Sequence, residues 1–347
     1  YSACIAEREE ALEDRRFHSI RGAQWEGSYG DQFTNRPKLE ANVVGNAVMR
    51  VVNEYRNNRI TVDFISKEGD EYDELADMCD GLYRADEQDS RAQEAYDNAF
   101  EEAVGGGFGA YRLVAEYEDE YDEEDDKQRI RIEPIYDADT CVFFDPSAKR
   151  QDKSDARFCF VLQGMTRDAF EAEYNESPTD WGRPNLTGGS NFDWSTPDLV
   201  YIAEYYVIEE KRETVFFYKS IDGEEERYTE ADFKRDEGLN DKLAAIGTTL
   251  SRQKTVKRRR VHKYILSGGG VLEDCGIIAG SEIPVVPVYG KRWYVDGVER
   301  FAGAVRYAKD MQRLKNMQIS SVADIASRSS VPKPIVTPSQ VAGLESY

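Results

Sequence analysis

Apolar residues recur every fourth position in an N-terminal stripe formed by Leu39, Val43, Ala47, Val51 and Tyr55. This spacing predicts a helix that opens at Pro37, because proline suits the first turn of a helix. A short alternating strand is predicted over residues 60–64. Two more helices are predicted over residues 72–82 and 92–103, and Gly105-Gly106-Gly107 would end the second.

The period of the apolar pattern then changes from helical spacing to two, which is typical of strands. Short helices are predicted over residues 166–174 and 231–246, and a long polar loop over residues 177–197. The pattern therefore favours an α+β fold, with a helical first part and a part rich in antiparallel strands. The predicted strands cover residues 110–117, 129–135, 157–163, 199–209, 214–219, 255–266, 270–278 and 283–289.

The last predicted element is a long amphipathic helix from Arg300 to about Arg328, a stretch that contains no proline. Its apolar stripe cannot be buried by one helix alone, so the helix needs neighbours. These come from its own domain, from sequence beyond this chain or from other copies of the chain. The stripe contains Phe301, Val305, Ala308, Met311, Leu314, Val322 and Ile325.

The charge of the chain limits its partners. There are 45 Lys and Arg residues against 67 Asp and Glu residues, a net charge of −22. Proteins that grip nucleic acid tightly usually present a basic surface, although an acidic chain can surround DNA without gripping it. Residues 299–347 carry a net charge of +3 and the preceding residues −25.

The remaining composition narrows the class of protein further. No apolar run approaches about 18 residues, so no membrane span is predicted. The five cysteines contain no C-x-x-C pair and favour free thiols over a zinc ribbon or a disulfide framework. The chain lacks an initiating Met and ends without a closing element, so we expect it to be an excerpt of a longer protein.

Two groups of basic residues are candidate binding sites. Arg306, Lys309 and Arg313 share one face of the long helix. The run Lys257-Arg258-Arg259-Arg260 would contact nucleic acid or an acidic neighbouring subunit, or else form a solvated strand face.

The sequence gives weaker evidence for an enzymatic site than for these basic groups. The segment Gly105–Gly109 follows a helix and precedes a strand, the reverse of a dinucleotide-binding turn. From Glu116 to Asp126 nine of eleven residues are acidic, which favours a solvated hairpin tip over a metal site. Asp137, Asp139 and Asp145 would suit a metal-dependent nuclease only loosely. We therefore assign no catalytic, cofactor or metal site.

Several strings of residues, spread in order over nearly the whole chain, resemble the portal proteins of short-tailed (podovirus-type) bacteriophages. The strings are Arg16-Phe17-His18 through Gln24-Trp25; Gly107–Val114 followed by Glu116–Asp119; Asp152–Arg157; Lys257–Val261; Ile278–Gly280 with Ile283–Val288; and Lys309-Asp310 through Arg313–Met317, then Ala323–Ile325. The acidic run at Glu116–Asp126 is longer than the pattern expected of that family.

The resemblance implies a non-enzymatic ring, typically of twelve identical subunits, at one vertex of the virion capsid. Double-stranded DNA would enter and leave through its axis. The expected partners are the terminase large subunit, a tail adaptor or head-completion protein, and capsid and scaffolding proteins. The ring would be assembled in the cytoplasm of the bacterial host.

The resemblance also suggests a division of the chain. Residues 1–108 would form the helical part of a wing, 109–298 its β-rich part, 299–330 the first stem helix and 331–347 the start of a clip. Arg306, Lys309 and Arg313 would then face the channel or the next subunit. The basic run would lie between subunits, and Lys333 and Pro334 would face a partner at the clip. The alternatives are the metal-dependent nuclease and a protein-binding adaptor that forms no ring.

Overall fold

The computed structural model describes residues 4–66, 72–118, 127–178, 192–219, 225–235, 243, 248–329, 337 and 342. Helices and antiparallel strands are mixed, which confirms the predicted α+β class. The helices are α1 (Ile5–Ser19), η1 (Ala23–Trp25), α2 (Ser28–Asp31), α3 (Val43–Asn57), α4 (Asp73–Ser90), α5 (Ala92–Gly105), α6 (Ala138–Cys141), α7 (Arg167–Tyr174), α8 (Glu230–Arg235) and α10 (Ala304–Ser329). No described helix combines the length and apolar character that crossing a membrane requires.

The strands form two larger sheets and one hairpin, all antiparallel. One sheet has the order β2-β1-β9, the other has the order β3-β4-β5-β7-β8 with β6 paired to β5, and β10 pairs with β11. The strands are β1 (Phe108–Tyr117), β2 (Gln128–Ile135), β3 (Val142–Phe144), β4 (Phe158–Thr166), β5 (Leu199–Lys219), β6 (Glu225–Thr229), β7 (Thr249–Ser267), β8 (Gly270–Ile278), β9 (Val285–Tyr289), β10 (Lys291–Val295) and β11 (Val298–Ala302).

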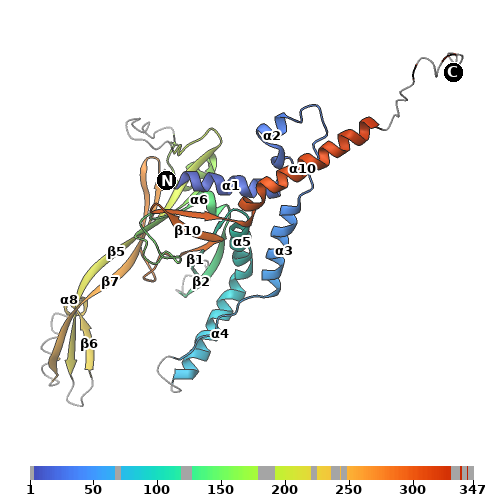
Figure 1. Cartoon of the computed structure of the whole chain (residues 1–347). Helices are drawn as coiled ribbons and strands as arrows, with labels where there is room; N and C mark the ends of the chain where they lie inside the picture. The colour runs from blue at the N-terminus through green and yellow to red at the C-terminus, as the bar shows by residue number, and fades with distance from the viewer. Residues whose placement is uncertain are drawn as a thin grey trace.

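Three parts of the chain project from this body (Figure 1). Strands β5 and β7 run far beyond the sheet, and α4 extends in the same direction, to the right of these strands in the view. Helix α10 leaves the body on another side and points away from it. At 1.5 Å per residue its 26 residues span roughly 39 Å.

Two of the four buried apolar clusters among the described residues involve α1. The larger joins α1, both sheets and β11 around the fully buried side chains of Phe108, Val142 and Val261. The guanidinium of Arg8 lies 3.9 Å from the ring centroid of Phe108 within it. The smaller cluster packs Phe17 of α1 against α3 and against Val305 at the start of α10.

The helix predicted to open at Pro37 is wrong in both its start and its buried face. Helix α3 begins at Val43, because the Asn42 side chain caps it by accepting from the Gly45 N–H at 2.8 Å. The buried stripe is Val44, Val48 and Val52, whereas Leu39, Val43 and Val51 are exposed. Residues 37–42 form no regular secondary structure, because side chains of α10 accept hydrogen bonds from the backbone N–H groups of Leu39 and Ala41.

Other predictions fail at element boundaries. Residues 60–64 are extended but belong to no described strand, and Ile60 is 83% exposed. The strands predicted over 199–209 and 214–219 are one continuous strand, β5. The long helix begins at Ala304 rather than near residue 300, since residues 291–302 form the β10–β11 hairpin, which the sequence pattern missed.

The remaining predicted elements agree with the structure more closely. Helices α4, α5 and α7 and strands β1, β2, β4, β7, β8 and β9 are present, with β7 extending back to Thr249. The helix predicted over 231–246 is described as α8, and most of its later residues lie outside the described part of the chain. Most of the loop predicted over 177–197 also lies outside it.

Glycines bring the start of α10 into close contact with the end of α5. A Cβ atom added to Gly303 would lie 2.2 Å from the Gly105 carbonyl oxygen, and one added to Gly107 would lie 2.5 Å from the Ala302 carbonyl carbon. Gly107 also has a φ of +104°, which side-chain-bearing residues rarely adopt. Because Gly303 and Gly107 have no side chains, the backbone before α10 can lie directly against the end of α5, and this contact determines where α10 leaves the body.

We predict that Gly303→Ala lowers the free energy of unfolding by about 1–3 kcal/mol, because the added methyl meets backbone that cannot yield. The matched control is Gly81→Ala in the exposed middle of α4, where a Cβ meets nothing within 4 Å. That variant should be neutral or more stable by up to about 1 kcal/mol. Denaturant titration followed by circular dichroism measures both, and equal effects of the two substitutions would contradict the prediction.

Candidate functional site

The predicted cations of the long helix lie where α10 crosses α1. Arg306 Nε donates to Asp14 Oδ2 at 2.8 Å, and Arg306 Nη1 lies 3.0 Å from Glu10 Oε2. Lys309 Nζ lies 2.6 Å from Asp14 Oδ1 and 3.0 Å from Glu13 Oε1. The three cations, including Arg313, therefore meet carboxylates of their own chain, which sequence spacing alone did not identify.

Asp14 is the centre of this cluster because its side chain is almost completely buried. A buried carboxylate is unfavourable unless cations and hydrogen bonds replace its water. Arg306 and Lys309 approach its two oxygens separately, so each oxygen faces a cation. The cluster therefore fixes the angle between α1 and α10.

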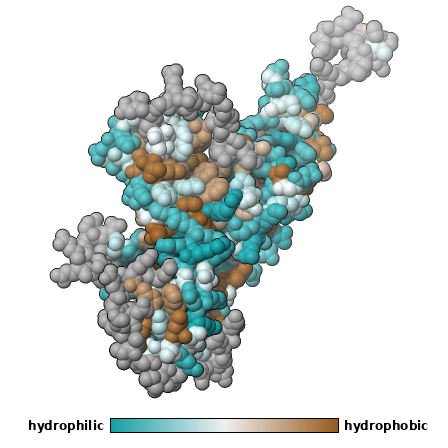
Figure 2. All heavy atoms as spheres, turned by 90° about the vertical axis from the view of Figure 1, so that its left-hand side faces the viewer, coloured by the Kyte–Doolittle hydropathy of each residue, from teal (hydrophilic) through white to brown (hydrophobic). Residues whose placement is uncertain are grey.

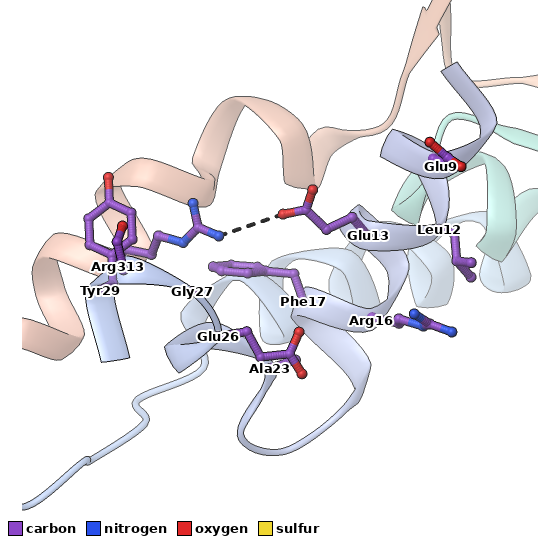
Figure 3. Close-up of a pocket in the computed structure, with 11 residues that line it drawn as sticks. Glu9, Leu12, Glu13, Arg16, Phe17, Ala23, Glu26, Gly27, Tyr29 and Arg313 are labelled. Atoms are coloured by element: carbon purple, nitrogen blue, oxygen red, sulfur yellow. Dashed lines mark ion pairs between the residues drawn. The ribbon is translucent and has the colours of Figure 1, made fainter. Parts of the chain in front are cut away.

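Arg313 extends the contact towards α2 (Figure 3). Its guanidinium carbon lies 5.3 Å from the ring centroid of Phe17 and 4.9 Å from that of Tyr29, distances typical of cation–π contacts. Its Nη2 lies 3.6 Å from Glu13 Oε1. These side chains line a hollow of about 600 Å³ beside α1, whose mixed charges favour no single ligand chemistry.

A buried polar row continues along the same face of α10. Gln312 Oε1 accepts from the Val43 N–H at 3.1 Å, Asn316 Oδ1 from the Ala41 N–H at 3.1 Å, and Ser320 Oγ from the Leu39 N–H at 3.0 Å. All three side chains are buried. Their spacing of four residues places them on one helix face, where they hold residues 39–44 along α10. The sequence pattern does not predict this row, because apolar spacing marks the apolar stripe of the helix as its buried face.

The opposite face of α10 is apolar and exposed. Met311 is 69% exposed and Val322 66% exposed, although both are large apolar side chains. At 100° per residue these positions lie across the helix from the buried row. The exposed apolar stripe consists of Tyr307, Met311, Leu314, Val322 and Ile325.

The predicted basic run lies on β7, in the part that extends beyond the body. Arg258 and Arg260 both lie 3.0 Å from a carboxylate oxygen of Glu213 on β5. Arg259 Nη1 lies 3.2 Å from Glu282, and Lys257 Nζ lies 3.6 Å from Glu210. The run therefore divides between the two faces of the strand rather than forming one continuous site.

The carboxylates considered for a nuclease serve as ion-pair partners. Arg15 lies 2.7 Å from Asp137 and 2.6 Å from Asp139, whereas Asp145 accepts from Arg157 Nε at 3.0 Å. Burial raises the pKa of the nearby Glu102 to about 7, against the opposing effect of Arg15. Within the described ranges, no group of three or more His, Cys, Asp or Glu residues could hold a metal ion.

Some predicted sites lie outside the described part of the chain. These are Lys333, Pro334 and most of the acidic run, of which Glu116–Glu118 are described. Glu116 Oε1 lies 2.6 Å from Arg129, and its hydrogen bonds with Arg129 and Arg131 outweigh a burial effect and lower its pKa. The roles predicted for Lys333 and Pro334 stay predictions.

His262 and His18, the two histidines of the chain, have opposite environments. His262 Nε2 faces Asp274 Oδ1 at 2.5 Å and Nδ1 faces Glu209 Oε1 at 3.3 Å, and the hydrogen bond with Asp274 raises the pKa of the ring. Burial lowers the pKa of His18. His262 thus joins β5, β7 and β8 most strongly when it is protonated.

The chain is similar over its whole length to known proteins. A family model described as phage P22-like portal protein matches residues 1–347. A protein named "Portal protein" from Acyrthosiphon pisum secondary endosymbiont phage 1 is 40% identical over 349 residues. The match covers 99% of this chain and 48% of that protein, so the chain spans about half the length of this relative.

We predict that Arg306→Ala combined with Lys309→Ala lowers the free energy of unfolding by about 3–5 kcal/mol, because Asp14 is left buried without a cation. Adding Asp14→Asn should restore part of the loss, since no buried charge then remains. Denaturant titration of the three proteins measures this. Full stability of the double variant, or no recovery on adding Asp14→Asn, would refute the role given to Asp14.

A second prediction concerns pH. The raised pKa of His262 means that its pairing stabilises the fold fully below about pH 6.5, and that this stabilisation is lost as pH rises through the folded-state pKa. Histidine-selective NMR titration should show His262 titrating above His18, and Asp274→Asn should lower the pKa of His262 alone. A pKa of His262 unchanged in that variant would argue against the pairing.

Proposed function

This chain belongs to the phage P22-like portal protein family, and on that premise we propose that it is the ring-forming part of a non-enzymatic portal subunit. Identical subunits, with twelve the typical number for such rings, would surround an axial channel at one capsid vertex. Double-stranded DNA would pass through the channel during packaging and ejection.

The single observation that carries this proposal is the inverted polarity of α10. The helix buries a polar row against its own chain and exposes the apolar stripe Tyr307, Met311, Leu314, Val322 and Ile325. Exposed apolar stripes of this length mark interfaces, because leaving them in water is unfavourable. Copies related by rotation about one axis would give every stripe the same neighbour.

We assign the parts of the subunit on the same basis. Residues 1–108 and 109–298 would be the helical and β-rich parts of the wing, and 299–330, with α10 at its centre, the first stem segment. Residues 331–347 would begin the clip. Figure 1 supports this division, since α10 alone carries the chain away from the body towards its C-terminal end.

The net charge of −22 suits a passage that must hold DNA without gripping it, because like charges oppose tight contact with phosphate. Arg306, Lys309 and Arg313 already meet carboxylates of α1. We therefore propose that they anchor the stem to the wing. A role in facing DNA or the next subunit is the alternative. The expected partners are the terminase large subunit, a tail adaptor, and capsid and scaffolding proteins, within the virion.

The proposal is tested on the full-length protein. Electron micrographs should show rings with an axial opening. Met311→Glu combined with Val322→Glu should raise the concentration needed for ring assembly at least about tenfold, because two charges would enter an apolar interface. Mass photometry measures the fraction of subunits in rings.

Asp310→Lys is the control, because it changes the charge of an exposed residue on α10 outside the apolar stripe. That variant should assemble like the natural protein. Rings of unchanged stability in the double variant, or a natural protein that stays monomeric or dimeric, would contradict the proposed function.

A further inference from the structure

Helix α4 carries an uncompensated negative charge. It contains seven carboxylates and one arginine, a net charge of −6. Asp80 lies within 3.9 Å of Arg84, and Glu87 accepts from the Tyr96 hydroxyl at 3.1 Å. No ion pair joins Glu74, Asp86 or Asp89 to a cation among the residues that the structure describes. The helix packs on α5 and β2 along one side and leaves its other side to solvent.

The exposed side of α4 is also apolar at its centre. Leu75, Met78 and Leu82 are between 55% and 63% exposed. Their spacing of three and four residues places them in one stripe. Asp86 and Asp89 border the same stripe one and two turns further along, since 100° per residue brings them to this side of the helix. An apolar stripe with acidic borders is suited to a partner that is basic and has aliphatic surface.

The projecting part of β5 and β7 has the complementary character. We call residues 209–219 of β5 and 249–260 of β7 the β-arm. It contains nine basic and three acidic residues, a net charge of +6. In the antiparallel register Lys211 faces Arg258 and Arg212 faces Lys257. Like charges directly opposite each other destabilise a pair of strands. Arg258 and Lys257 are compensated by Glu213 and Glu210 of the same chain. No ion pair among the described residues compensates Lys211 or Arg212, so these two positions gain from an acidic partner.

Strand β6 pairs with the β-arm over Val215–Lys219 and α8 packs against β5, so the part of the β-arm without a second neighbouring strand among the described residues is 209–214 of β5 and 249–260 of β7. In the described part of the chain, β4 pairs with β5 only as far as Val207 and β8 pairs with β7 only from Val261. Lys211 and Lys254 are exposed, lie on the same face of the β-arm and form no described ion pair. Figure 2 shows hydrophilic surface across the middle of the molecular face towards which the β-arm projects.

From these observations we propose that the acidic, apolar-striped side of α4 docks on the basic face of the β-arm of a neighbouring copy. The inference rests on the proposed ring. Figure 1 shows α4 and the β-arm projecting in the same direction from separate parts of the body. In a ring of more than two copies, each contact between neighbours joins two unlike surfaces. The aliphatic stems of Lys and Arg can cover Leu75, Met78 and Leu82.

The basic run Lys257–Arg260 could contact either nucleic acid or an acidic neighbouring subunit. The proposed docking favours the neighbouring subunit. A nucleic-acid surface would use the cations of the β-arm against phosphate and would leave α4 without a partner. A neighbouring α4 satisfies both surfaces with charges of equal size and opposite sign. Opposite charges across an interface fix its register and suppress wrong partners.

The test is a charge exchange in the full-length protein. Asp86→Lys with Asp89→Lys on α4, and Lys211→Glu with Lys254→Glu on the β-arm, should each raise the concentration for ring assembly at least about tenfold. Combining all four should return it to within about threefold of the natural protein. Asp168→Lys with Glu173→Lys on the exposed surface of α7 is the control and should have no effect.

Cross-linking of the natural ring provides a measurement that does not depend on variants. A carbodiimide should join carboxylates of α4 to Lys211, Lys254 or Lys257. In rings mixed from ¹⁵N-labelled and unlabelled subunits, mass spectrometry should find such links between copies.

The outcomes separate the two proposals. A natural protein that forms no ring refutes the proposed function. Rings that resist both single-side exchanges, exchanges that fail to rescue each other, or links from the β-arm to other elements overturn the docking. A β-arm exchange that abolishes retention of DNA on a filter and leaves the ring intact assigns the arm to nucleic acid and also overturns it.

Discussion

The position of α10 depends on burying one carboxylate, Asp14, between two cations of that helix. Removing a charge from water is strongly unfavourable, so the arrangement persists only if Arg306 and Lys309 reach it together. This requirement fixes the first turns of α10 on α1. Gln312, Asn316 and Ser320 then extend the contact by satisfying the backbone of residues 39–44.

Burying polar groups on one side of α10 has a consequence for the other side. The apolar stripe that would normally form the inner face is presented to solvent, from Tyr307 to Ile325. Among the described residues, Val305 and Ala308, at the start of the helix, are the α10 side chains that join an apolar cluster. Under the proposed function, this stripe is covered by copies of the subunit in the ring.

Helix α4 and the β-arm also present surfaces that their own chain does not cover, but these surfaces are charged. Helix α4 and the β-arm each carry six charges of one sign, and each would be more stable beside the other. The single chain keeps them on separate parts of the body (Figure 1). Unlike surfaces on one subunit generate rings when the rotation between copies closes.

Apolar spacing in the sequence was sufficient for α5, α7 and most strands, because burial on one side dictates their period. It also predicted α4, although the apolar stripe of that helix is exposed in the structure. The resemblance to portal proteins followed from ordered strings of residues. Only the tertiary structure decided that α3 begins at Val43 and buries Val44, and that α10 buries polar side chains. Those outcomes depend on hydrogen bonds and ion pairs between residues up to about 300 positions apart, such as Arg306 with Asp14, which no local pattern contains.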